Sequence, residues 1–395
     1  MIYLDNNATT QVDPLVFEKI KPYFVDQFYN ASSNTHSLGI KVKNVVEDCR
    51  ELIAEIFNRN PQEIIFTSGS TESINLALKG ILYDATNENL ITTSIEHKAV
   101  LDAATSIKNN KRIYIQPNNF GQVTSEQIES RIDKNTKIVS VISTNNEIGT
   151  DNNLRKILEI LPEEVVFHTD ATQSLTHKKE NIVEIGLLNE RVDMISVSAH
   201  KFHGPKGIGL LIANKRTQDK LLPIIHGGNH ERGLRSGTLN VPGIIGLTEA
   251  LRIQNECKVS VETLRVEFEK NLIKKLPEEA KYSINGMRPT SPIFQKKYGL
   301  LEDELAGHPG NISITFEDIQ ATSIIAGVPD LAIATGSACT SATSSPSHVL
   351  QETGLSLEQA QSTIRISLSR FTTNEEVHTA TDMIADAVKD YLERI

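Results

Sequence analysis

The chain has 395 residues, enough for two or three domains of ordinary size. Apolar residues make up 39% and charged residues 23%, which is close to globular usage and excludes a disordered or collagen-like chain. The net charge of −10, without a dominant basic block, argues against an extended footprint on nucleic acid. The three widely spaced cysteines argue against a disulfide framework.

The sequence also lacks the signals that direct a chain into or across a membrane. It contains no run of eighteen apolar residues, and residues 1–5 do not open a basic region followed by an apolar one. We therefore expect a cytoplasmic protein that does not associate with membranes.

Short apolar runs alternate with stretches of helical periodicity from about residue 40 to residue 250. The expected helices are 40–57, 72–82, 99–107 and 154–161, and the expected strands are 63–67, 90–93, 137–142, 165–168, 193–197 and 208–212. This alternation predicts βαβ units wound into a largely parallel sheet. Because ligands bind beyond the carboxyl ends of the strands in such sheets, we expect the chemistry directly after these runs.

The pattern changes after about residue 255. A charged amphipathic helix is expected at 259–276, and a proline-rich stretch at 285–311 follows it. Strands at 312–316 and 364–368 and a closing helix at 375–393 complete the chain. We expect a large domain over residues 16–254, and a smaller α/β domain formed by residues 1–15 and 255–395.

The segment Thr67–Ser73 follows a strand and opens a helix. Its glycine lets backbone amides approach an anion, its hydroxyl groups donate hydrogen bonds, and the helix dipole favours negative charge there. These features suit a phosphate. An ordinary helix cap, with Ser70 or Thr71 as the capping residue, explains the same letters equally well.

A lysine at the end of a later strand points to a specific cofactor. Lys201 follows the strand at 193–197 and precedes Gly204–Gly207, a position suited to an amine nucleophile. Pyridoxal 5′-phosphate supplies both a carbonyl for such an amine and a phosphate for the segment Thr67–Ser73. Its pyridine nitrogen needs a carboxylate, and Asp170 ends the preceding strand. A solvated surface lysine is the simpler alternative, but it leaves this succession unexplained.

Other polar groups at strand ends carry less information by themselves. His97 and Asn146 each follow a strand, where a surface histidine or a polar turn is common. The histidine pair His226 and His230 has helical spacing, but two glycines lie between them and no cysteine is near. We therefore expect no metal site.

Cys339 differs from the other two cysteines in its surroundings. It lies in a stretch of small hydroxylic residues, 336–347, that is typical of an exposed loop. Structural cysteines are usually buried and inert, whereas a thiolate on a loop is an available nucleophile. We expect Cys339 to be functional and its mobile loop to carry a sulfur atom away from the site.

Taken together, these segments resemble the cysteine desulfurases, a branch of the fold-type I pyridoxal-phosphate enzymes similar to the class-V aminotransferases. The resemblance runs almost from end to end and includes the subgroup with a long cysteine loop. The segments that carry it are 3–10, 67–73, 96–100, 145–149, 170–174, 198–201, 230–238 and 336–341. It implies a large cofactor-binding domain with a mostly parallel seven-stranded sheet wrapped by helices, and a smaller α/β C-terminal domain.

The resemblance also implies roles for individual residues. Lys201 would hold the cofactor covalently and move the Cα proton, and Asp170 would pair with the pyridine nitrogen. Gln173 would bond the phenolic oxygen, while His97 would stack on the ring and move protons. The implied phosphate ligands are Ser70, Thr71, Ser198 and His200, with Thr238 from the partner subunit of a homodimer.

The implied reaction converts L-cysteine to L-alanine. Arg365 would bind the substrate carboxylate, Asn146 would orient substrate or cofactor, and Cys339 would accept the sulfur as a persulfide. A sulfur-acceptor protein would then take it for iron–sulfur cluster assembly or for thio-modification of tRNA or DNA, without direct contact between this chain and nucleic acid. A selenocysteine lyase or another pyridoxal-phosphate β-lyase remains the alternative.

Overall fold

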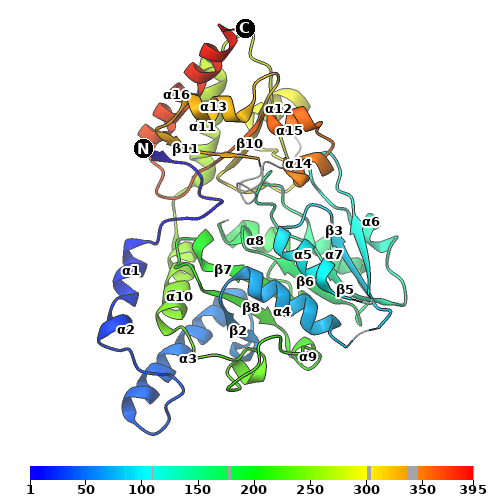
Figure 1. The fold of residues 1–395 in the computed structure, drawn as a ribbon, viewed down its shortest axis with the longest axis vertical. Helices are drawn as coiled ribbons and strands as arrows, with labels where there is room; N and C mark the ends of the chain where they lie inside the picture. Colours follow the sequence, from blue (N-terminus) through cyan, green and yellow to red (C-terminus); the bar gives the residue numbers. More distant parts are fainter. Residues whose placement is uncertain (85, 109, 177–178, 300–303, 337–345, 395) are drawn as a thin grey trace.

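The computed structural model describes residues 1–84, 86–108, 110–176, 179–299, 304–336 and 346–394. Two lobes are visible in Figure 1. The large lobe consists of a seven-stranded sheet and helices α1–α10. The small lobe consists of a four-stranded sheet with α11–α16 and the N-terminal strand β1 (Ile2–Tyr3), which pairs in parallel with β11 (Leu331–Ala332). Both ends of the chain therefore lie in the small lobe.

The large sheet has the strand order β2-β8-β7-β6-β5-β3-β4. Its strands are β2 (Ile64–Thr67), β3 (Asn89–Thr93), β4 (Lys111–Ile115), β5 (Thr136–Ser140), β6 (Val166–Asp170), β7 (Met194–Ser198) and β8 (Gly209–Ala213). All neighbours are parallel except β8, which runs antiparallel to β2 and β7. The expectation of a mostly parallel seven-stranded sheet in an α/β protein is confirmed.

Helices cover both faces of this sheet because its strands are apolar on both sides. Ile138 and Val139 are adjacent on β5 and belong to different hydrophobic clusters, since successive side chains of a strand point to opposite faces. One face packs against α3 (Ser37–Phe57), α7 (Leu154–Ile160) and α10 (Val241–Glu256), and the other against α4 (Ser70–Leu82) and α5 (Lys98–Ser106). The remaining helices of this lobe are α1 (Pro14–Ile20), α2 (Pro22–Val25), α6 (Ser125–Glu129), α8 (Lys179–Ile185) and α9 (Lys215–Gln218).

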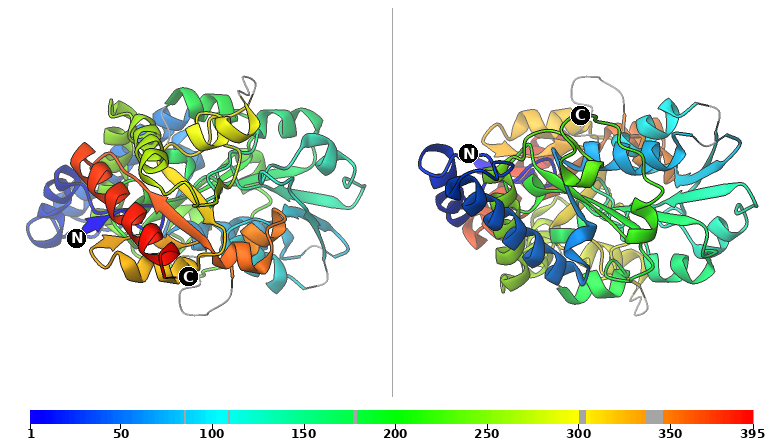
Figure 2. Two further views of the ribbon diagram at one scale, coloured as in Figure 1. Left: turned by 90° about the horizontal axis from the view of Figure 1, so that it is seen from above. Right: turned by 90° about the horizontal axis from the view of Figure 1, so that it is seen from below.

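The small lobe has its own hydrophobic cluster, in which Leu4 from the N-terminus packs with residues from 268 to 388. Its antiparallel sheet has the order β12-β13-β10-β9, formed by β9 (Tyr282–Ile284), β10 (Asn311–Phe316), β12 (Ala334–Thr335) and β13 (Thr363–Ser367). Figure 2 shows α11 (Val261–Lys275) and α16 (Asn374–Leu392) side by side over this lobe. The shorter helices are α12 (Pro292–Tyr298), α13 (Ala321–Gly327), α14 (His348–Glu352) and α15 (Leu357–Gln361).

Two differences from the sequence-based expectation have simple causes. Strand β4 was not expected, because it lies at the edge of the sheet and most of its side chains are exposed. Helix α12 begins in the proline-rich stretch with Pro292 in its first turn, where proline lacks an amide hydrogen that a helix does not need. Within the described residues, no helix is both long enough and apolar enough to cross a membrane.

Candidate active site

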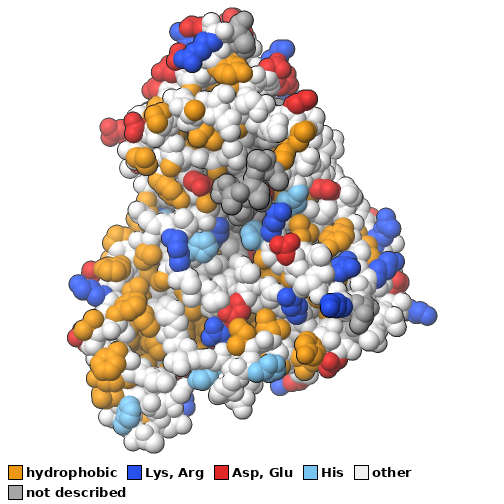
Figure 3. Space-filling view, viewed as in Figure 1, with side chains coloured by type: hydrophobic (Ala, Val, Ile, Leu, Met, Phe, Trp, Pro, Cys, Tyr) orange, Lys and Arg blue, Asp and Glu red, His pale blue; other side chains and the backbone are white. Residues whose placement is uncertain are grey.

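A cavity of about 420 Å³ opens at the carboxyl ends of β6 and β7, beside the N-terminus of α4. Figure 3 shows histidine and basic side chains around the hollow between the two lobes. The predicted residues that line this cavity are Ser70, Thr71, His97, Asn146, Asp170, Gln173, Ser198, His200 and Lys201. The structure therefore brings together side chains from segments that are more than one hundred residues apart.

The N-terminus of α4 forms the anion-binding end of the cavity. Gly69 is the N-cap residue, with φ 154°, and it has no side chain that could cap the first amides of the helix. Ser198 Oγ borders this helix end, since it lies 3.4 Å from the position that a Cβ of residue 69 would take. Open amides, nearby hydroxyl groups and the positive end of the helix dipole suit a phosphate.

His200 adds a neutral donor at this end. Burial, together with the charges of Lys201 and Lys206, lowers the pKa of His200 to about 4. The imidazole is therefore neutral near pH 7, and its Nδ1 lies 3.1 Å from Thr9 Oγ1. When Nδ1 accepts from this hydroxyl group, Nε2 carries the proton and acts as a donor.

Lys201 ends the short 3₁₀ helix η3 (Ala199–Lys201), which directly follows β7. Its Nζ donates to the carbonyl oxygens of Asn7 at 2.6 Å and Ala8 at 2.8 Å. These carbonyls belong to the N-terminal segment, which crosses from the small lobe to the cavity. The segment 3–10, singled out in the sequence for its resemblance alone, is thus in direct contact with the amine.

Asp170 is buried at the end of β6, beside β7, where Asp170 is in register with Ser196. One of its oxygens, Oδ1, accepts from the amide of Thr172 at 3.0 Å. Two neighbouring buried atoms, Gln173 Oε1 and Thr172 Oγ1, have no hydrogen-bond partner among the described residues. Because unpaired buried polar atoms are costly, these two indicate a site built for a polar ligand.

This donor set fits pyridoxal 5′-phosphate. The cavity has an amine in Lys201, a carboxylate in Asp170, an anion-binding helix end in α4, and buried polar atoms without protein partners. Gln173 Nε2 donates one of its two hydrogens to Asn7 O at 3.0 Å. Its predicted bond to the phenolic oxygen of the cofactor stays a prediction.

His97 is the N-cap residue of α5, and its Nδ1 accepts from the amide of Ala99 at 3.1 Å. This bond fixes the ring orientation and assigns the proton of the neutral imidazole to Nε2. The residue before it, Glu96, was missed as a site residue. Burial raises the pKa of Glu96 to about 8, although Oε1 accepts from the amide of Ile142 and from Thr93 Oγ1. Glu96 belongs to the segment 96–100 that carries the family resemblance, but only the fold shows that its side chain is completely buried.

A second buried carboxyl group lies next to Asn146. Burial raises the pKa of Glu147 to about 7, against the opposing effects of Ser347, which donates to its Oε2, and of the Arg365 charge. The charges of His97 and Lys98 act in the same direction as that of Arg365. The loop that contains Asn146 therefore contacts both lobes.

Two predicted residues are not among those that line the cavity. Arg365, on β13, is fully buried and donates to Asp5 Oδ1 at 2.8 Å and to Asn146 O at 3.2 Å. Thr238 is exposed on the loop before α10. Their predicted roles, with the substrate carboxylate and with a partner's phosphate respectively, stay predictions.

Cys339 lies outside the described residues. Described residues on either side of it form hydrogen bonds with the rest of the chain. The amide of Gly336 donates to Thr363 O at 3.1 Å within the small lobe, and Ser347 donates to Glu147 of the loop that contains Asn146.

Comparisons with known proteins identify the family of this chain. The class-V aminotransferase family matches residues 2–379. Cysteine desulfurase IscS from Pseudomonas putida (strain W619) is 39% identical over 395 residues, covering 98% of this chain and 92% of that protein. A solved NifS-like protein has a TM-score of 0.83 at 32% identity and covers 98% of this chain and 99% of its own. A structure described as SspA in complex with cysteine has a TM-score of 0.78 at 33% identity and covers 94% and 100%.

Proposed function

The chain belongs to the class-V aminotransferase family and is a pyridoxal-phosphate-dependent cysteine desulfurase, and from this premise we propose what each of its residues contributes. The net reaction joins the sulfur of L-cysteine to the thiol of Cys339, giving L-alanine and a Cys339 persulfide. One bond between Cβ and sulfur breaks, one sulfur–sulfur bond forms, and no outside oxidant or reductant is needed. The observation that carries the proposal is the meeting of Lys201, Asp170 and the N-terminus of α4 in one cavity.

Bound pyridoxal 5′-phosphate supplies the carbonyl that captures the substrate amine and the ring that withdraws electrons from Cα. Asp170 would hold the protonated ring nitrogen, and the amides of α4, with Ser70, Thr71, Ser198 and His200, would hold the phosphate. A neutral His200 suits this role as a donor that adds no further charge beside Lys201 and Lys206. His97, fixed by Ala99, would present a ring face and a proton on Nε2.

Lys201 would move the proton at the substrate's Cα. Lys201 follows β7 and Asp170 ends the adjacent strand β6, so the base and the carboxylate for the ring nitrogen reach one cavity from adjacent strands. The two carbonyl oxygens of Asn7 and Ala8 accept from this amine and limit where it can reach. Holding a base in this way removes much of the entropic cost of proton transfer.

Arg365 would bind the substrate carboxylate. In the structure, its guanidinium group donates to Asp5 and to Asn146 O, while its buried Nε has no hydrogen-bond partner among the described residues. A substrate carboxylate would satisfy such a group, and Asn146 lies next to it at the cavity wall.

The experiment follows the sulfur atom. Purified protein loaded with pyridoxal 5′-phosphate is mixed with L-cysteine without added thiol, and peptides are analysed by mass spectrometry for one extra sulfur. We expect the persulfide on Cys339, with one alanine formed per persulfide. Cys257→Ser and Cys49→Ser are the matched controls and should retain it.

Two variants separate the steps of the proposal. Cys339→Ser should keep the visible absorbance of the bound cofactor and lose the persulfide. Lys201→Ala should instead lose the absorbance that arises when the cofactor is covalently joined to Lys201. If Cys339→Ser released sulfide at the parental rate, the assignment of the nucleophile would be wrong. If the parental protein bound no cofactor, the proposed function itself would fail.

We propose that a second copy of this chain covers an apolar surface on the large lobe. Figure 3 shows hydrophobic side chains along the edge formed by α1, α2 and the start of α3. The exposed residues there are Leu15, Phe17, Phe24, Val25, Phe28, Leu38 and Ile40. A patch of this kind is unusual on a monomer and typical of a homodimer interface. In such a dimer, Thr238 would bind the phosphate of the cofactor held by the partner subunit.

Light scattering after size-exclusion chromatography tests the dimer. The parental protein should have twice the chain mass of 43.7 kDa. The double variant Phe24→Asp and Phe28→Asp should be monomeric. Tyr83→Asp is the control, because Tyr83 is equally exposed but lies at the far end of α4. A parental monomer, or a dimer that survives the double variant, would contradict the proposed interface.

We further propose that the persulfide leaves by thiol exchange to a sulfur-acceptor protein. The thiol of the acceptor attacks the outer sulfur, and Cys339 leaves as a thiolate. Incubating the persulfidated protein with candidate acceptors and following the extra sulfur by mass spectrometry tests this. Transfer should require a cysteine on the acceptor, and transfer to a cysteine-free variant would refute thiol exchange.

A further inference from the structure

Three side chains of the small lobe hold the backbone of the active-site loop Asn145–Thr150. Arg365 donates to Asn146 O at 3.2 Å, and Asn311 Nδ2 donates to Glu147 O at 3.2 Å. Arg288 Nη1 donates to Gly149 O at 3.1 Å. Asn146 lines the cavity, so the position of its side chain depends on contacts made from the other lobe.

Arg288 is the least expected of the three. It is only 1% exposed, and burial lowers its pKa to about 9. Its Nη2 donates to His308 O at 2.7 Å and to Asn311 O at 2.5 Å, so its three hydrogen-bond partners among the described residues are carbonyl oxygens. A buried cation without a direct carboxylate partner is costly, which indicates that its hydrogen bonds serve a purpose beyond stability.

The surrounding backbone is shaped to admit this guanidinium group. Gly149 has φ 72°, and a Cβ there would lie 2.5 Å from Arg288 Nη1. Gly307 has φ 77°, and a Cβ there would lie 2.8 Å from the same nitrogen. Two glycines in left-handed conformations, one on each side of the nitrogen, therefore make room for Arg288 to reach Gly149 O.

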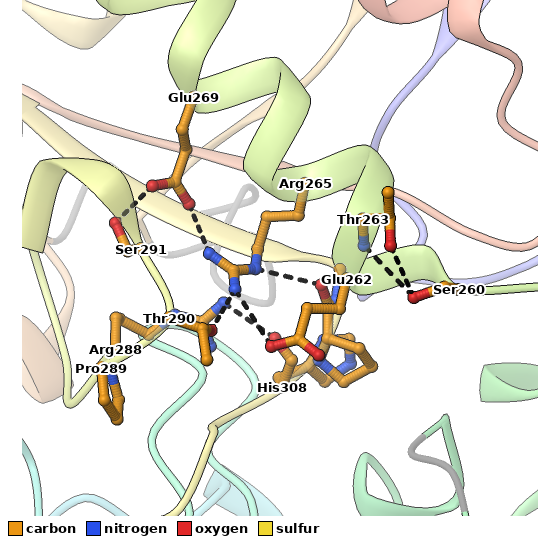
Figure 4. A network of polar contacts seen from close by, with 12 residues as sticks. Ser260, Glu262, Thr263, Arg265, Glu269, Arg288, Pro289, Thr290, Ser291 and His308 are labelled. Atoms are coloured by element: carbon orange, nitrogen blue, oxygen red, sulfur yellow. Dashed lines mark hydrogen bonds and ion pairs between the residues drawn. The ribbon is translucent and has the colours of Figure 1, made fainter. Parts of the chain in front are cut away.

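A separate network fixes the segment that carries Arg288 (Figure 4). Arg265 on α11 donates to Glu269 at 2.6 Å, to Thr290 Oγ1 at 2.5 Å and to Pro309 O at 3.1 Å. Glu269 also accepts from Ser291 Oγ. This network joins both ends of the 288–310 segment to α11, and none of these contacts involves the active-site loop. It therefore holds the segment that carries Arg288 in place without contacting the active-site loop.

We propose that Arg288 is a positioning residue for the desulfurase reaction: Gly149 O accepts from Arg288 and from the amide of His308 at 2.8 Å, and because Arg288 also holds His308 O, it fixes the Asn145–Thr150 loop and thereby the place of Asn146 at the cavity wall. The inference rests on the proposed function for its substrate, L-cysteine. Arg288 touches neither substrate nor cofactor, and its effect passes through the loop backbone. Small displacements of this kind change reactivity strongly, because reacting groups must be held within fractions of an ångström.

The test compares Arg288→Met with a matched control. Methionine keeps much of the length and packing of the side chain but donates no hydrogen bonds. The control is Arg265→Met combined with Glu269→Gln, which removes an equally buried arginine from the adjacent network without leaving a buried charge unpaired, since its other partner Glu262 is partly exposed to solvent. Both proteins are loaded with cofactor, and the KM for L-cysteine, the kcat and the urea midpoint are measured.

We expect Arg288→Met to raise the KM for L-cysteine about tenfold or more. The control should lower the urea midpoint and leave the KM within about twofold of the parental value. Binding of L-alanine, followed by the visible absorbance of the bound cofactor, should weaken in Arg288→Met by a similar factor. If Arg288→Met and the control change the KM equally, or neither changes it, Arg288 is merely structural and the proposal is wrong.

A second variant covers the case in which Arg288→Met does not fold. Gly307→Ala keeps the guanidinium group, but its Cβ would lie 2.8 Å from Arg288 Nη1 and 2.9 Å from Gly149 O and would push the two atoms apart. It should raise the KM in the same direction, and an unchanged KM would overturn the proposal. The two hypotheses fail differently. A parental protein that makes no alanine from L-cysteine contradicts the proposed function, whereas the absorbance titration with L-alanine still reports on Arg288.

Discussion

His168 provides a quantitative test of how the large sheet is held together beneath the active site. It lies on β6, two residues before Asp170, and is completely buried. Its Nδ1 is 2.8 Å from Ser140 Oγ on β5, and its Nε2 is 2.9 Å from Ser196 Oγ on β7. One imidazole thus connects three adjacent strands. Burial lowers the pKa of His168 to about 3, so the ring is neutral in the folded protein.

The lowered pKa makes stability depend on pH in a known direction. In the unfolded chain His168 takes up a proton below about pH 6.5, whereas in the folded chain it does so only near pH 3. The unfolded state therefore binds more protons in this window, and the stability present above pH 6.5 is lost as the pH falls. The loss for one proton is about 1.4 kcal/mol per pH unit, or about 2 kcal/mol by roughly pH 5.

The assay is urea unfolding of the parental protein and of His168→Gln at a series of pH values from about 7 to about 5. Glutamine keeps a donor and an acceptor but does not titrate. The free energy of unfolding of His168→Gln should therefore fall by about 2 kcal/mol less over this pH range than that of the parental protein. His378→Gln is the control, because His378 is exposed on α16. Equal acid losses in the parental protein and in His168→Gln would refute the reasoning.

Three further predictions concern other buried groups. Glu231→Ala should destabilise the protein by about 3–5 kcal/mol in urea unfolding, because Arg50 would keep a buried charge without its bidentate partner; a loss below about 1 kcal/mol would contradict this. Gly149→Ala should reduce the free energy of unfolding and raise the KM for L-cysteine together, since φ is 72° and the new Cβ meets Arg288; an unchanged KM would count against it. Glu96 has a pKa raised to about 8 by burial, so the folded state keeps a proton that the unfolded state releases above about pH 4.5. The stability of Glu96→Gln relative to the parental protein should therefore rise between pH 5 and pH 8, and a flat difference would refute the burial of this group.

Much of the large sheet is predictable because buried parallel strands leave an unmistakable pattern. Strands β3, β6 and β7 were expected within two residues of their observed positions, since each is a short apolar run bounded by polar residues. Polar residues directly after such runs gather at one edge of a parallel sheet. For that reason the sequence also indicated that Asp170 and Lys201 would meet near the start of α4, and they line one cavity.

The parts that the sequence did not reveal depend on contacts between distant segments. Nothing local to Glu96 or Glu147 says that these carboxyl groups are buried, because burial is decided by the lobe that packs over them. Arg288 lies in a proline-rich stretch without periodicity, and its partner Gly149 is 139 residues away. Neither residue carries a pattern that identifies the other.

The sequence by itself predicted most of the residues that line the cavity and the strands that they follow, because residue type and local periodicity are properties of short segments. Only the tertiary structure decided what holds those residues in place. The carbonyls of Asn7 and Ala8 reach Lys201 from 194 and 193 residues away, and the active-site loop is fixed by side chains of the other lobe. Such contacts depend on how the two lobes, each with its own hydrophobic cluster, pack against each other. The local pattern of residues along the sequence does not indicate that packing.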